Sequence, residues 1–107
     1  MKNIYYSPDL WGLDVVGEID YSVLDYHFDR RVVWKNKETC ALYTARDAGC
    51  SCPTPFEDYR GLEDLDILDY QALENEVKSE ASRSKDSDIM KWGREFLNKV
   101  SEAMKVT

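Results

Sequence analysis

The spacing of apolar residues changes once along the chain, near its middle, and this change limits the folds that the chain can adopt. Before residue 47 apolar and polar residues alternate, as in half-buried strands, whereas after residue 61 apolar residues recur every three or four positions, as on one face of a helix. Residues 49–59 lie between the two halves and hold two of the three cysteines and two of the three prolines. The sequence therefore predicts a sheet followed by a helical cover.

Three segments of the first half predict strands, at about residues 13–21, 26–35 and 40–46. The expected inward rows are Leu13, Val15, Ile19 and Tyr21 in the first strand and Tyr26, Phe28, Val32 and Trp34 in the second, and in the third Cys40, Leu42 and Thr44 alternate with Ala41, Tyr43 and Ala45. Gly17 interrupts the first row and marks a bulge. Arg30 falls on the second row, so we expect it to lie at a sheet margin or to pair with an acid. Together the segments predict an antiparallel meander with one filled face.

The second half is expected to cover that face. The apolar residues from 62 to 81 have helical spacing, and they are Leu62, Leu65, Leu68, Ala72, Leu73, Val77 and Ala81. Ile67 and Tyr70 lie off this stripe, which indicates a separate short turn before a helix that starts near Tyr70 with Asp69 as its cap. A final helix, capped by Ser87 or Asp86, carries its apolar face on Ile89, Trp92, Phe96, Val100 and Met104, and Gly93 allows close approach to the sheet.

The predicted fold class is therefore α+β, a three-stranded antiparallel β-meander packed against two C-terminal helices. We expect a single domain over residues 1–107, with the meander and the Cys/Pro loop in residues 1–60 and the helical cover in residues 61–107.

Charge restricts the partners. The net charge of −7 argues against nucleic acid and against a membrane surface, and it suits a protein partner with a basic surface. The acids of residues 57–76 outnumber the single base, Arg60, by seven; they are Glu57, Asp58, Glu63, Asp64, Asp66, Asp69, Glu74 and Glu76. They form either a solvated face, with acids near helix N-termini, or an acidic docking patch or phosphate mimic. No targeting or membrane-spanning segment is visible, so we expect a cytoplasmic location.

The cysteines allow two interpretations. Cys50 and Cys52, with Cys40 and His27 upstream, could supply zinc ligands, but a C-x-C pair is closer than the usual spacing in tetrahedral zinc sites. The alternative is that Cys50 and Cys52 are small buried residues beneath a loop stiffened by Pro53 and Pro55. We therefore expect no cofactor, with a small structural zinc protein as the alternative.

The loop and its surroundings resemble a known family. Val16-Gly17-Glu18-Ile19-Asp20, Val33-Trp34, Glu38-Thr39, Leu42-Tyr43 and the run from Gly49 to Tyr59 are similar to an uncharacterised family of small proteins encoded by phages of actinobacteria. The resemblance covers about residues 5 to 70, and its specific part is the GCSCPxPFED loop. After Glu38-Thr39 the family pattern has glycine where this chain has Cys40. The resemblance implies a phage setting and brings no activity with it.

The chain has no glycine-rich phosphate loop, no HExxH and no G-x-S-x-G, so we expect no catalysis of its own. The expected function is to bind and modulate a host protein, as an inhibitor or a host-takeover factor. The predicted contact residues share a stiff aromatic and acidic loop and a nearby aromatic, and they are Trp11, Pro53, Pro55, Phe56, Glu57, Asp58 and Tyr59. The alternative for Phe56 is a core residue that closes the edge of the sheet.

Overall fold

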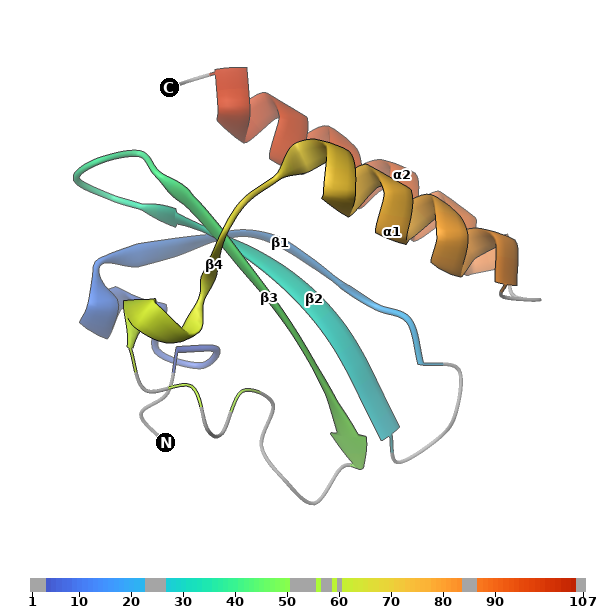
Figure 1. The fold of residues 1–107 in the computed structure, drawn as a ribbon, viewed down its shortest axis with the longest axis horizontal. Coiled ribbons are helices and arrows are strands. Elements are labelled where there is room, and N and C mark those ends of the chain that lie inside the picture. Colours follow the sequence, from blue (N-terminus) through green and yellow to red (C-terminus); the bar gives the residue numbers. More distant parts are fainter. Residues whose placement is uncertain are drawn as a thin grey trace.

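A computed structural model of the chain describes residues 4–22, 27–50, 56, 59, 61–83 and 87–105. Its elements, in chain order, are the 3-10 turn η1 (Pro8–Trp11), the strands β1 (Leu13–Asp20), β2 (His27–Asn36) and β3 (Leu42–Cys50), the 3-10 turn η2 (Leu62–Asp64), the strand β4 (Asp66–Ile67), and the helices α1 (Tyr70–Arg83) and α2 (Ser87–Lys105). Figure 1 shows α1 and α2 side by side along one side of the sheet. None of the helices in the described ranges is long and apolar enough to cross a membrane.

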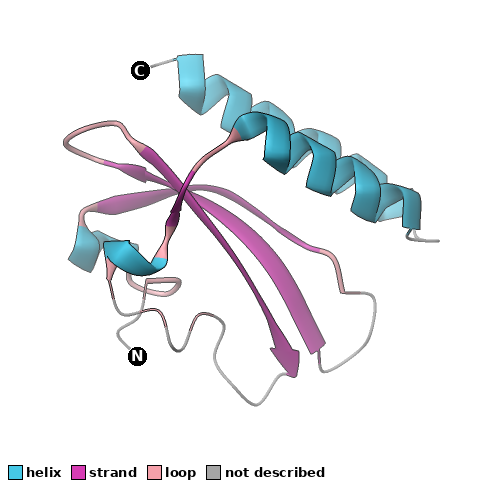
Figure 2. Cartoon of the chain, viewed as in Figure 1, coloured by secondary structure: helices cyan, strands magenta, loops and turns pink. Residues whose placement is uncertain are grey.

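The sheet is antiparallel and has four strands in the order β1-β2-β3-β4 (Figure 2), so the prediction of three strands is wrong. The fourth strand is short: Ile67 pairs with Tyr43, and Asp66 with Thr44. The apolar residues of the segment 62–68 have helical spacing, and this spacing hid the short strand in the sequence. Leu62 belongs to η2 instead, and Leu65 packs on the side of the sheet away from the helices.

Both faces of the sheet are covered, not one. The helix-side core consists of Ile19, Tyr21, Val33, Leu73, Val77, Ile89, Phe96 and Val100. The loop-side core consists of Ile4, Leu13, Val32, Trp34, Ala45, Phe56 and Leu65. Neighbouring residues of β2 supply both, because successive side chains of a strand point to opposite faces. Val32 and Trp34 were expected under the helices, but they lie on the other side.

The predicted bulge in β1 is confirmed, and it explains a second correction. The register steps from Val15↔Trp34 to Gly17↔Val33, which leaves one extra residue in β1 between them. Leu13 therefore points into the loop-side core, whereas Ile19 points into the helix-side core. The expected single row of inward residues in β1 is wrong because the bulge reverses the alternation. Val15, expected inward, is exposed.

The third strand begins and ends later than predicted. It runs over Leu42–Cys50, and Cys40 lies in the preceding turn with a φ of 63°, in the left-handed region. Gly49 and Cys50 are thus strand residues rather than loop residues. Tyr26, an expected inward residue of the second strand, lies outside the described residues. The expectation that Arg30 pairs with an acid is confirmed, since its Nε donates to Asp20 Oδ2 at 3.2 Å.

The helices begin close to the predicted positions. The Ala72 N–H donates to Asp69 Oδ1 at 3.2 Å, which confirms Asp69 as the cap of α1. In α2 the predicted face is only partly buried: Trp92 and Met104 are exposed, whereas Ile89, Phe96 and Val100 are buried. Gly93 faces both α1 and the sheet, and the tighter approach is to α1: a Cβ there would lie 2.6 Å from Val77 Cγ1 and 3.8 Å from Ile19 Cδ1 of β1.

Candidate functional site

Phe56, the expected aromatic anchor, is buried in the loop-side core with none of its surface exposed. Its ring stacks on Tyr5 with a centroid distance of 5.6 Å and meets the Trp34 ring edge-on at 5.5 Å. Its backbone has a φ of 62°, and its N–H donates to Asp47 Oδ2 at 2.8 Å. In this conformation Phe56 closes the core, which was the alternative interpretation, and it presents no surface to a partner.

The other predicted contact residues are only partly visible. Tyr59 is half-buried, its ring lies 5.1 Å from the Phe56 ring, and burial together with the nearby Asp47 charge raises the pKa of its hydroxyl. Trp11 ends η1 and packs against the same loop-side core, so the structure brings Trp11, Phe56 and Tyr59 to one core. Pro53, Pro55, Glu57 and Asp58 lie outside the described residues, and their contact with a partner stays a prediction.

The zinc candidates are divided between the two ends of β3. His27 is exposed and lies directly opposite Cys50 in the β2–β3 register. Cys40 precedes the other end of β3, so it does not join them. Cys52 lies outside the described residues. Within the described residues no group of three or more His, Cys, Asp or Glu side chains could hold a metal ion.

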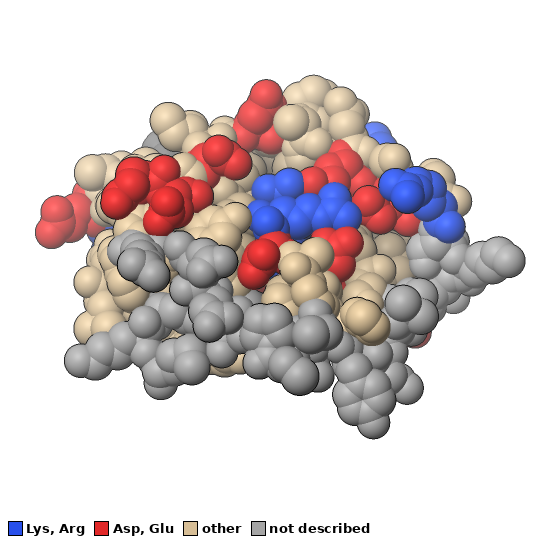
Figure 3. All heavy atoms as spheres, turned by 60° about the horizontal axis from the view of Figure 1, so that its bottom comes forward, with Lys and Arg blue, Asp and Glu red and all other residues tan. Residues whose placement is uncertain are grey.

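Within the described residues, the acidic segment divides into acids that pair with a Lys or Arg and acids that do not. Glu76 accepts hydrogen bonds from Arg31 Nε and from the Tyr21 hydroxyl, both at 2.9 Å, and a second, shorter bond from Arg31. Glu74 pairs with Lys78 at 3.4 Å. In contrast, Glu63, Asp66 and Asp69 are exposed, and none of them pairs with a Lys or Arg in the described part of the chain. On the face in Figure 3, acidic side chains border a central basic group, and a further acidic group lies apart from it.

A polar network between α1 and the sheet pairs Arg31 with Glu76, and Arg46 with Asp29 and Glu80. Arg46 on β3 makes two hydrogen bonds of 2.8 Å to the Asp29 carboxylate and one of 3.1 Å to Glu80. Burial alone would raise the pKa of Glu76, but its bonds to Arg31 and the charges nearby outweigh burial and lower that pKa. The hydroxyl of Tyr21 has a raised pKa because of burial and the adjacent Glu76 charge. The carboxylate of Glu76 therefore stays ionised, and its bonds to the sheet hold α1 in place.

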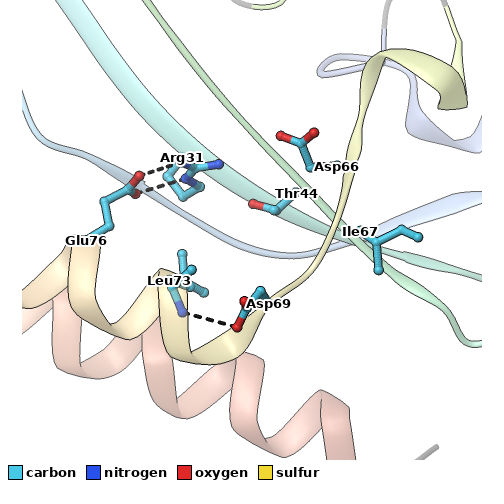
Figure 4. Close-up of a pocket in the computed structure, with 8 residues that line it drawn as sticks. Arg31, Thr44, Asp66, Ile67, Asp69, Leu73 and Glu76 are labelled. Atoms are coloured by element: carbon cyan, nitrogen blue, oxygen red, sulfur yellow. Dashed lines mark hydrogen bonds and ion pairs between the residues drawn. The ribbon is translucent and has the colours of Figure 1, made fainter.

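Beside this network lies a cavity of about 250 Å³ between α1 and the β3–β4 edge. Arg31, Thr44, Asp66, Asp69, Leu73 and Glu76 line it, and Figure 4 shows Arg31 directed at Glu76. Glu76 thus neutralises the charge of Arg31, and the carboxylates of Asp66 and Asp69 remain in the lining. The cavity has a negative character that suits a cation.

An apolar groove of about 390 Å³ adjoins this cavity at Ile67, which lines both. Its apolar lining comes from the turn before β3, from β3, from β4 and its following residue, and from the end of α2, as Cys40, Leu42, Tyr43, Ile67, Leu68 and Met104. Ile67 has 82% of its surface exposed, the largest exposure among the large hydrophobic residues of the described part of the chain. Exposed apolar surface rimmed by charged residues is typical of a contact surface.

Sequence analysis missed Ile67 as a site residue, although a signal was present. Ile67 did not fit the helical stripe on either side of it, so the helical interpretation left this large apolar residue without a buried position. What the sequence could not show is that this residue ends a sheet and lies between a cavity and a groove.

The comparisons with known proteins give one match. A family model described as a domain of unknown function (DUF7574) matches residues 2–107, and so includes both helices, whereas the resemblance seen in the sequence reached only about residue 70. No curated protein and no solved structure matches the chain.

Proposed function

This chain belongs to the DUF7574 family, and we propose that it is a non-catalytic module that binds a protein partner through the surface around β4. We call this surface the β4 surface; it consists of Glu63, Asp66, Ile67 and Asp69 with the apolar groove beside them. The partner presents a basic surface with an apolar side chain at its centre.

The observation that carries the proposal is the exposure of Ile67 beside Asp66 and Asp69, which pair with no Lys or Arg among the described residues. Isoleucine is usually buried, and covering its exposed surface would stabilise a complex by about 1.5–3 kcal/mol. The neighbouring acids favour a basic partner, because charge complementarity speeds association and disfavours acidic competitors.

The proposal moves the apolar anchor from the Cys/Pro loop to β4. Phe56 is buried, so Ile67 takes the role first expected of it. The loop residues Pro53, Pro55, Glu57 and Asp58, with Trp11 and Tyr59, stay in the proposal as flanking contacts. The loop resemblance supports the setting, which is a phage protein that acts in the cytoplasm of its host and inhibits or redirects a host protein.

The test is affinity capture from a host lysate with the wild-type chain and matched variants. Asp66→Lys and Ile67→Ser change exposed side chains, so both variants should fold as the wild type does. The proposal expects a protein that binds the wild type, binds less in high salt, and is lost with either variant. Glu95→Lys reverses an exposed charge on α2 and serves as the control. A captured protein that binds all three variants equally would contradict the proposal.

A structural zinc site is the second candidate, and one observation favours it. His27 and Cys50 are cross-strand neighbours at one end of the sheet, next in sequence to the segment that holds Cys52. Neighbouring strands of a sheet can supply ligands to one tetrahedral ion. Metal analysis of the purified chain, with a melting curve before and after a chelator, tests this. One zinc per chain and a lower melting temperature after chelation would favour it.

A further inference from the structure

β4 is the last strand of the sheet, and its outer edge is the feature from which the partner's shape can be inferred. The Leu68 N–H donates to the Leu42 carbonyl at 3.0 Å, so Leu68 directs its backbone groups toward β3. Successive residues of an antiparallel ladder direct these groups to opposite sides. The N–H and C=O of Ile67 therefore point away from β3, and no other strand of the described residues pairs with β4 on that side.

The two side chains of β4 point to opposite faces of the sheet, and one of them lines both hollows. Asp66 is opposite Thr44 in the ladder and lines the acidic cavity with Glu76. Ile67 lines the apolar groove with Leu68 and also contributes to the lining of the acidic cavity. In Figure 4, Asp66 and Ile67 lie on opposite sides of the β4 ribbon. A strand added at this edge would alternate in the same way, with one residue beside Asp66 and the next beside Ile67.

The two hollows differ in what they would accept. The acidic cavity, at about 250 Å³, is smaller than the roughly 300–1,000 Å³ of typical small-molecule sites, which suits an inserted side chain. Asp66 and Asp69 in its lining pair with no Lys or Arg where the structure describes the chain, so their carboxylates select a cation. The groove has leucine, isoleucine and methionine in its lining, which selects an aliphatic side chain.

We propose that the partner docks through an extended segment in which a lysine or arginine is next to an aliphatic residue, and that this segment joins the sheet at β4. The cation enters the acidic cavity beside Asp66, the aliphatic side chain covers Ile67 over the groove, and the outward backbone groups of Ile67 bond to the added strand. This rests on the proposed function and specifies the partner. A partner helix would satisfy the charge and the apolar contact, but it would leave those backbone groups unused.

The probe is a short peptide in which lysine and valine alternate, added to the full chain and followed by amide NMR. The control peptide has the same composition with all lysines before all valines. The alternating peptide should shift the amide resonances of Asp66, Ile67 and Leu68 and slow hydrogen exchange at the Ile67 amide. Equal shifts with the block peptide, or shifts spread evenly over acids far from β4, would overturn the proposal, because charge alone would then explain the binding.

Three variants refine the test. Ile67→Ser should weaken binding of the alternating peptide about tenfold, since it removes the apolar contact. Asp66→Asn should weaken it roughly twofold to fivefold, as for an exposed ion pair. Glu95→Gln on α2, an exposed acid that lines neither hollow, should leave it unchanged. A wild-type affinity in Ile67→Ser would overturn the proposal.

The two proposals can fail separately. If the captured partner is lost with Asp66→Lys and Ile67→Ser but the alternating peptide shifts no β4 amide, the proposed function stands and the added strand is wrong. If the peptide binds at β4 but no captured protein depends on these residues, the docking geometry stands and the proposed function is wrong.

Discussion

The two faces of the sheet are covered by different kinds of structure. On the helix side, two regular helices supply the cover, and their buried residues Leu73, Val77, Ile89, Phe96 and Val100 recur at helical spacing. On the loop side, short irregular segments supply it, and they include a cluster of aromatic rings in which Tyr5, Trp34 and Tyr59 surround Phe56. The cover on the helix side therefore depends on apolar residues at helical spacing, and the cover on the loop side depends on a few large side chains.

The polar groups of the two faces differ as well. The helix side satisfies its buried charges through the network of Glu76, Arg31 and Arg46. On the loop side the Trp34 Nε1–H has no hydrogen-bond partner, the only buried side-chain nitrogen or oxygen of the described residues in that position. A tryptophan is kept there for its volume, since an unsatisfied buried donor costs about 1–3 kcal/mol. The difference indicates that side-chain packing contributes a larger share of the stability on the loop side than on the helix side.

The largest expected effect comes from removing one ring from each face. Phe96→Ala and Phe56→Ala should each lower the free energy of unfolding by about 3–5 kcal/mol, because both side chains are buried. In the variants that still fold, denaturation followed by tryptophan fluorescence and by circular dichroism should give coincident transitions. If Phe56→Ala costs less than about 1 kcal/mol, the loop-side cover adds little to the stability of the sheet.

The second effect tests the polar network. Glu76→Gln should lower the free energy of unfolding at neutral pH by about 1.5–3 kcal/mol, because it removes hydrogen bonds between charged groups. The folded protein holds the Glu76 pKa below its usual 4.5. The stabilisation by the carboxylate is therefore complete above that value and is lost as the pH falls through the lowered pKa. Denaturation at a series of pH values should show this loss in the wild type and a smaller loss in Glu76→Gln, with Glu95→Gln as the control.

The third effect concerns the close contact of the helices. In an exposed helix Gly→Ala would gain about 1 kcal/mol. Gly93→Ala should instead cost about 1–3 kcal/mol, because the new Cβ would lie 2.6 Å from Val77 Cγ1. Asn98→Ala, at an exposed position of the same helix, should be neutral or slightly stabilising. A stabilising Gly93→Ala would show that α1 and α2 can separate without loss.

The smallest effect is expected in the turn that joins β2 to β3. Cys40 has a φ of 63°, a conformation in which glycine has no steric penalty, and glycine is also the residue expected here from the family pattern. Cys40→Gly should stabilise the protein by at most about 1 kcal/mol. Cys40→Ala keeps a Cβ and should give no such gain. Thermal melts of the two variants provide the measurement.

Sequence periodicity predicted the helix side better than the loop side. The cap at Asp69 and the burial of Ile89, Phe96 and Val100 in α2 follow from local rules, and the structure confirms them, whereas Trp92 of the same predicted face is exposed. Alternation alone predicts one inward row of residues in β2, so it does not predict a sheet that is buried on both faces. The run of Val32, Val33 and Trp34 in β2 was the available signal, since consecutive apolar residues are typical of a strand buried on both faces.

The candidate site was predicted in its chemistry but not in its place. The acidic character of residues 57–76 was read from composition, and the structure shows which of these acids lack an internal partner, such as Asp66. The position of Ile67 depends on a pairing with Tyr43, which is distant in sequence and formed by only two residues of β4. A strand this short carries no periodicity, so only the tertiary structure reveals it.

The extra residue in β1 has a consequence for protein engineering. Val16 lies between the part of β1 that serves one core and the part that serves the other. Deleting Val16 would therefore act on the side chains as a frameshift acts on codons, since one half of the strand would face the wrong way. A graft of either face onto another scaffold must carry β1 whole, and a chimera that joins two homologues within this strand must keep the count of its residues.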